Sequence, residues 1–184
     1  MTENLVRKLS RRLYMGDVRE LCRRIETDAG DEAKEALFGL ITHPDSRVGY
    51  NVLWVFSHLH APADGWLRQK RDALADLLLA TRHTGQRRLL LSLLERQPAS
   101  PENLRTDLLD YCLAGILSTE PYAIRALCLK LSYALCRFHP ELTDELQTVA
   151  EMMDNGQLSP ALRATRRHVL TRIARQRKKS AGRD

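Results

Sequence analysis

The clearest pattern of apolar and polar positions lies between Thr119 and Phe138, where apolar side chains recur at helical spacing. Echoes of this segment occur on either side at steps of 38 residues, beginning with the column Gly49, Arg87, Arg125 and Arg163. The column one place before it reads Val48, Gln86, Ile124 and Leu162. The column six places after it reads Val55, Leu93, Leu131 and Val169, and the column seven places after it reads Phe56, Leu94, Ser132 and Leu170. A fixed period of this length is typical of stacked helical hairpins, so the sequence predicts an all-α solenoid.

Apolar spacing and helix-breaking residues together predict about ten helices in five hairpins. The expected helices span residues 3–15, 17–25, 31–42, 46–60, 65–82, 86–97, 102–118, 120–138, 141–154 and 160–176. The expected breaks are Gly16, His43–Asp45, Ala61–Ala63, Gly85, Pro98–Pro101, His139–Pro140 and Asn155–Gly156. Asp17, Asp64 and Ser159 are predicted N-caps, and Arg177–Asp184 is predicted to be a frayed basic tail.

The charge of the chain is unevenly distributed. The net charge is +6, but residues 1–24 hold seven basic and three acidic side chains, and residues 163–184 hold nine and one. The middle of the chain is therefore acidic between two basic ends, which bears on its partners rather than on its fold. No apolar run approaches the length of a membrane span, and we expect residues 3–15 to be a structural helix rather than a signal or transit peptide. A cytoplasmic location follows as an expectation.

The sequence contains no motif that predicts catalysis or a cofactor. It has no phosphate loop, no dinucleotide-binding glycine pattern and no nucleophile elbow. His58 and His60 fall on nearly opposite faces of a helix, and Cys136 with His139 lacks two further ligands, so we expect no metal. The four cysteines lie within apolar stripes and are expected to be reduced core residues.

Two segments carry a resemblance to a known family. Pro121–Leu127 and Ser159–Ala164 resemble the start of the second helix of a HEAT repeat, and Asp45–Gly49 and Thr84–Arg88 are weaker copies. The resemblance covers about residues 31–176. It implies one right-handed HEAT-like superhelix over residues 1–184, with residues 1–30 as an atypical capping hairpin, 31–176 as repeats and 177–184 as a basic tail.

The sequence departs from the HEAT pattern in one column. HEAT families often place an aspartate six residues before the arginine, whereas this chain has His43, Thr81, Thr119 and Gln157 there. Two alternatives remain for the arginines at 87, 125 and 163: they bond helix-end carbonyls, or they are solvated.

The resemblance also implies a concave face lined by the second helix of each hairpin. The outward columns of those helices and the basic C-terminal segment give the candidate partner-binding residues Tyr50, Trp54, His58, Arg88, Arg96, Lys130, Tyr133, Arg137, His168, Arg172, Arg175, Arg177, Lys178 and Lys179. The alternatives are that Tyr50 and Trp54 turn inward and that the basic residues are only solvated.

Three functions are consistent with these residues. The leading hypothesis is a non-enzymatic scaffold that binds another protein, with no cofactor and no membrane association. The alternative is nucleic-acid binding through the basic and aromatic stripe and the basic C-terminal helix. The third is an enzyme similar to the HEAT-like DNA glycosylases for alkylated bases, but no aspartate falls within the stripe.

Overall fold

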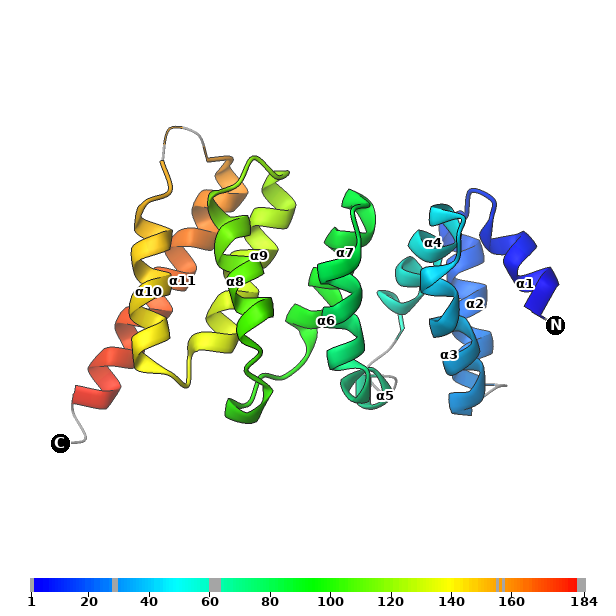
Figure 1. Ribbon diagram of the computed structural model, residues 1–184, viewed down its shortest axis with the longest axis horizontal. Helices are drawn as coiled ribbons and strands as arrows, with labels where there is room; N and C mark the ends of the chain where they lie inside the picture. The colour runs from blue at the N-terminus through cyan, green and yellow to red at the C-terminus, as the bar shows by residue number, and fades with distance from the viewer. Residues whose placement is uncertain (1, 28–29, 60–63, 155, 157, 182–184) are drawn as a thin grey trace. The chain divides into compact units, whose positions relative to one another are not determined.

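The structure is a computed structural model that describes residues 2–27, 30–59, 64–154, 156 and 158–181. The described residues form helices joined by short connections, with no strand among them (Figure 1). The helices are α1 (Thr2–Leu9), α2 (Met15–Thr27), α3 (Gly30–Gly39), η1 (Leu40–Thr42), α4 (Ser46–Phe56), α5 (Asp64–Gln69), α6 (Arg71–Ala80), α7 (Thr84–Arg96), η3 (Pro101–Asn103), α8 (Thr106–Leu117), α9 (Tyr122–Cys136), α10 (Pro140–Glu151) and α11 (Pro160–Ala181). The predicted all-α fold class is confirmed.

The chain divides into two compact units, Met1–Gln97 and Pro98–Asp184. In the first unit α2 packs on α3 and α4, α6 packs on α7, and α4 lies against α7. In the second unit α8 packs on α9, α10 packs on α11, and α9 lies against α11. Within each unit, the second helix of one hairpin therefore adjoins the second helix of the next hairpin. That the two units form one domain stays a prediction.

The 38-residue columns coincide with the buried face of these second helices. Val55, Leu93, Leu131 and Val169, the column six places after the arginines, are all at most 2% exposed. The column that begins with Val48 is buried throughout as well. Because equivalent positions point into the core in four successive hairpins, the register inferred from the sequence is correct.

Polar side chains that reach from one hairpin to the backbone of the preceding one reinforce this register. In the first unit Gln86 Nε2 donates to the Ser46 carbonyl (3.0 Å) and Arg96 Nη1 donates to that of Ser57 (3.2 Å). In the second unit Gln176 Nε2 donates to the Arg137 carbonyl (2.5 Å). Each bond joins residues 39 or 40 apart, close to one repeat, so the same interval sets both the apolar packing and these polar ties.

Two glycines predicted to break helices lie inside helices instead. Gly16 is the second residue of α2, where the Asp17 carboxylate accepts from the backbone N–H of Tyr14 (2.9 Å). Gly85 is the second residue of α7, and a Cβ there would lie 2.9 Å from a ring carbon of Tyr50. His83 caps α7, since its Nδ1 accepts from the N–H of Gln86 (3.2 Å). Gly85 thus provides room for packing rather than a turn.

Other predicted boundaries also shift. Helix α4 ends at Phe56 rather than His60, and Asp64 is the first residue of α5. The helix expected over 65–82 is divided at Lys70, whose Nζ binds the Glu35 carboxylate (2.6 Å) and lies 5.3 Å from the Trp66 ring centroid. The predicted breaks at Ala61–Ala63 and Asn155 lie outside the described residues.

The start of α11 agrees with the prediction and its end does not. The Ser159 hydroxyl accepts from the N–H of Leu162 (3.2 Å), so Ser159 is the N-cap expected before Pro160. Helix α11 continues to Ala181, so Arg177–Ala181 is helical rather than a frayed tail. The helix is held this far by Gln176 and by an ion pair between Arg177 and Asp144.

Candidate functional site

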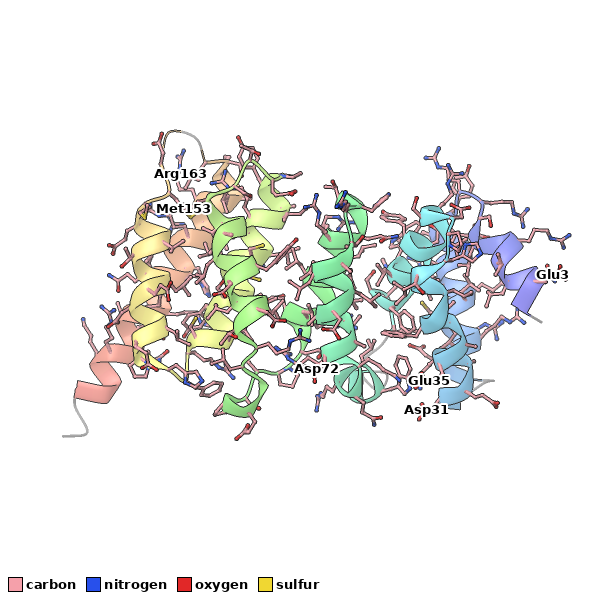
Figure 2. All side chains as sticks on the ribbon, in the orientation of Figure 1. Glu3, Asp31, Glu35, Asp72, Met153 and Arg163 are labelled. Atoms are coloured by element: carbon pink, nitrogen blue, oxygen red, sulfur yellow. The ribbon has the colours of Figure 1, made fainter. Side chains whose placement is uncertain are left out.

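Charge separates the first helices of the hairpins from the second helices. In the four hairpins that follow α1 and α2, the first helices have a net negative side-chain charge: −2 for α3, −1 for α6, −2 for α8 and −4 for α10. The second helices of these four hairpins have a net positive charge: +1 for α4, +2 for α7, +2 for α9 and +8 for α11. The first hairpin does not follow this rule, because α1 is +1 and α2 is neutral. Three of the first-helix acids, Asp31 and Glu35 on α3 and Asp72 on α6, are labelled in Figure 2. The second-helix face is therefore the positive face in both units.

In the first unit this face combines aromatic rings with cations. Tyr50 and Trp54 on α4 are half-buried, whereas His58 and the α7 residues Arg88 and Arg96 are exposed. The Trp54 and His58 ring centroids lie 6.1 Å apart in an edge-on arrangement. The two large rings therefore take neither extreme predicted from the sequence, because each packs along one side and is open on the other.

In the second unit Tyr133 does not face outward as predicted. It is 8% exposed, its hydroxyl lies 3.4 Å from Gln176 Oε1, and Arg172 Cζ lies 4.8 Å from its ring centroid. Position 133 turns towards α11, so the ring fills the space between α9 and α11. The exposed members of the predicted set in this unit are Lys130, His168, Arg172, Arg175, Arg177 and Lys178. The side chain of Lys179 lies outside the described residues.

Arg137 is half-buried and has structural contacts. Its Nη2 donates to the Ala99 carbonyl (3.0 Å), and its Cζ lies 4.6 Å from the Phe138 ring centroid. The exposed Phe138 ring is therefore partly covered by this guanidinium. Arg137 contributes charge to the face, but its contacts show that it also positions the segment before α8.

The arginine column mainly binds backbone carbonyls. Arg125 Nε donates to the carbonyl of Ile116 (2.9 Å) near the end of α8, and Arg163 Nη2 donates to that of Leu158 (3.3 Å). Arg87 instead lies 3.4 Å from the Thr84 hydroxyl. The carbonyl alternative thus holds for Arg125 and Arg163, and these bonds satisfy acceptors that helix ends and turns leave open.

A further arginine that binds helix-end carbonyls, Arg166, was not predicted from the sequence. Its Nε donates to the carbonyl of Ala150 (2.6 Å) and its Nη2 to that of Glu151 (3.3 Å), at the end of α10. The same column holds Val52, Leu90 and Cys128, all buried. An arginine in a core column was the available signal, because a guanidinium placed there must find acceptors.

A concavity in the second unit does not have the composition of a catalytic site. It has a volume of about 500 Å³ and is lined by Thr119, Glu120, Pro121, Tyr122 and Arg125 at the turn between α8 and α9. Arg125 is committed to the α8 carbonyl, and the lining holds no histidine or thiol that would pair with a nucleophile.

The cysteines are poor nucleophiles. Burial raises the pKa of Cys22 to about 11 and that of Cys136 to about 12, and a bond to Cys128 together with burial raises the pKa of Cys112. These thiols are neutral at ordinary pH, so they act as small apolar core groups. Within the described ranges, no three metal-ligating side chains lie close enough together to hold an ion. None of the described helices combines the length and apolar character that crossing a bilayer requires.

Comparison with known proteins addresses the family rather than the site. No curated protein and no solved structure matches the chain significantly. A family model for the HEAT repeat domain matches residues 5–173, which includes the first hairpin that the sequence columns did not reach. The buried columns, the paired helices and this match agree, and the chain belongs to the HEAT repeat domain family.

Proposed function

We propose that this protein is a non-enzymatic scaffold that binds another protein through the second-helix face of its first unit. HEAT repeat domains are helical scaffolds, commonly of protein interactions and typically without catalytic activity. The observation that carries the proposal is the charge difference between helices: in the four hairpins after α1 and α2, the first helix is net negative and the second helix is net positive. A repeated, one-sided charge of this kind favours encounter with an acidic partner on one face.

The composition of the first unit's face supports a protein partner. Trp54, Tyr50 and the exposed arginines Arg88 and Arg96 are of the residue types that dominate protein-binding hot spots. The half-buried rings are already held by neighbouring side chains, so they lose little conformational entropy when a partner covers them. A rigid aromatic centre with cations around it is typical of an interface core with a polar rim.

The proposal is tested by affinity capture with matched variants. The double variant Trp54→Ala/Arg88→Glu removes the central ring and reverses a charge on the second-helix face. The control Arg68→Glu makes the same charge change at an exposed position of α5, which is not one of the second helices. Each partner retained by the wild type is then purified and titrated by calorimetry against the wild type, the control and the double variant.

We expect the double variant to weaken binding of the purified partner by at least tenfold, because truncating a hot-spot residue costs about 2 kcal/mol or more. Circular dichroism confirms that both variants remain helical. Equal partner affinity of the double variant and the wild type would show that the second-helix face is not the binding surface.

A further inference from the structure

Helix α11 has the largest positive charge of the second helices, and like α4 and α9 it carries no carboxylate. Its sequence contains six arginines and two lysines. Four of the arginines have structural roles: Arg163 and Arg166 bind backbone carbonyls, Arg172 covers the Tyr133 ring, and Arg177 pairs with Asp144. These contacts account for half of the helix's cations.

The other described cations of α11 are Arg167, Arg175 and Lys178, and each is exposed. In the part of the chain that the structure describes, no carboxylate, carbonyl or aromatic ring engages any of the three. At 100° per residue they fall within about 80° of arc, opposite the buried stripe of Leu162 and Val169. They therefore form a single outward row.

The described acidic side chains of α10 do not neutralise the charge of this row. Two of the four carboxylates of α10 are engaged by other groups, since Asp144 pairs with Arg177 and Glu151 accepts from Gln147 Nε2 (2.7 Å). Among the described residues, no ion pair joins any of the four to the row. Arg167 stands in the column of Leu53, Leu91 and Leu129, which are all completely buried. Arg167 replaces the leucine of this column, so this side of α11 is polar and positive.

We propose that the row Arg167, Arg175 and Lys178 on α11 binds the phosphate backbone of double-stranded nucleic acid without reading its sequence. At 1.5 Å per residue, Arg167 and Arg175 lie about 12 Å apart along the helix axis. This distance is about the width of the major groove of a B-form duplex, so the two guanidinium groups match phosphates on its two edges. The site is distinct from the protein-binding face of the first unit.

Two features favour a duplex backbone over other anions of nucleic acid. Binding of single strands relies on exposed rings on which bases stack, and the ring next to this surface, Tyr133, is buried beneath Arg172. Each side chain of the row is a cation with donors and no acceptor, so phosphate oxygens alone can satisfy it. Contacts to phosphate alone position a protein on a duplex but do not select a sequence.

Fluorescence anisotropy with the full-length chain tests the proposal. The probes are a fluorescein-labelled 20-base-pair DNA duplex, a second duplex of unrelated sequence, the single strand, and a glutamate-rich peptide of equal length. Three phosphate contacts predict a slope of about −2.7 for log affinity against log salt, or about 40-fold weaker binding at 200 mM than at 50 mM salt. The two duplexes should bind equally and more tightly than the single strand or the peptide.

Matched triple variants separate the row from overall charge. Arg167→Gln/Arg175→Gln/Lys178→Gln should bring the salt slope close to zero and remove measurable duplex binding. The control Arg11→Gln/Arg19→Gln/Arg24→Gln removes the same charge from exposed positions of the first unit and should retain the slope. Because all six side chains are exposed, both proteins should keep the wild-type circular dichroism spectrum and melting temperature.

Three outcomes would overturn the proposal. An equal loss of duplex binding in both triple variants would mean that net charge alone is responsible. Tighter binding of the glutamate-rich peptide than of the duplex would assign the row to an acidic protein segment. A flat anisotropy baseline for the wild type at 50 mM salt would show that the row is only solvated. None of these results bears on the protein-binding face, which is tested with different residues.

Discussion

Replacement of Leu131 by alanine tests the repeat register at the centre of the second unit. Leu131 is completely buried on α9, whereas its neighbour Lys130 is exposed. The substitution removes three carbon groups, which at about 0.8 kcal/mol each amounts to about 2.4 kcal/mol of lost hydrophobic transfer free energy. The cavity that remains raises the total to about 2–5 kcal/mol.

The control is Lys130→Ala, because its Cα is adjacent in sequence but its side chain points away from the core. A substitution on an exposed helix position should change the free energy of unfolding by less than about 0.5 kcal/mol. For a chain of this length, a loss of about 3 kcal/mol lowers the melting temperature by roughly 6–12 °C. Scanning calorimetry and urea unfolding measure both changes.

Equal destabilisation by the two substitutions would refute the assignment of the columns. Val55→Ala and Val169→Ala extend the test to the same column in the first and last repeats. If the register is correct, each of these valine variants is less stable than the wild type, and the loss is smaller than for Leu131→Ala because fewer carbon groups are removed.

Three further predictions concern single polar contacts and the thiols. Arg125→Leu should cost about 1.5–3 kcal/mol in urea unfolding, because it removes a charged donor from the Ile116 carbonyl. Ser159→Ala should cost about 1 kcal/mol through loss of the α11 N-cap, whereas Ser159→Asp should restore most of it. The raised pKa values of Cys22 and Cys136, about 11 and 12, favour folding fully below pH 9, the ordinary thiol value, and this stabilisation should decline as pH rises from 9 towards 11–12. The double alanine variant should show a weaker decline in its urea midpoint over that range; an unchanged decline would assign the pH dependence to other groups.

The repeat register was predictable because the apolar positions of the second helices repeat at one interval. Val55, Leu93 and Leu131 identify the buried side of three successive helices without any structural information. The family match then extends this order to residues 5–173. What the sequence could not supply was the contact that each polar side chain makes, since those contacts depend on which carbonyls the neighbouring hairpin leaves accessible.

Glycine was the least reliable signal for helix boundaries. Gly16 and Gly85 were predicted to break helices but lie inside them. A Cβ at Gly85 would come within 2.9 Å of the Tyr50 ring, and one at Gly49 within α4 would come within 2.3 Å of the Ile41 carbonyl oxygen. Gly49 also explains why the first repeat lacks the arginine of its column, since the backbone of η1 passes directly over that position. A local rule treats glycine as a turn residue, but here its small size is needed for long-range packing.

The candidate surface was predictable in part. Exposure of Lys130, Arg172 and Arg175 follows from helical periodicity. Tyr133 was predicted to be exposed, but it is buried. A tyrosine side chain has an apolar ring and one polar atom. Burial between two helices removes the ring from water, and the hydroxyl hydrogen-bonds to Gln176. The sequence alone did not show that α11 would cover that ring.

The arginine that ends the leucine column also affects how copies of this protein meet one another. Repeat proteins with an apolar terminal layer are prone to add further molecules head to tail, because each new layer continues the core. Here such growth would have to bury Arg167 against another chain, and a guanidinium without a partner in a dry contact is costly. An arginine at position 167 therefore disfavours an apolar contact between this side of α11 and another chain.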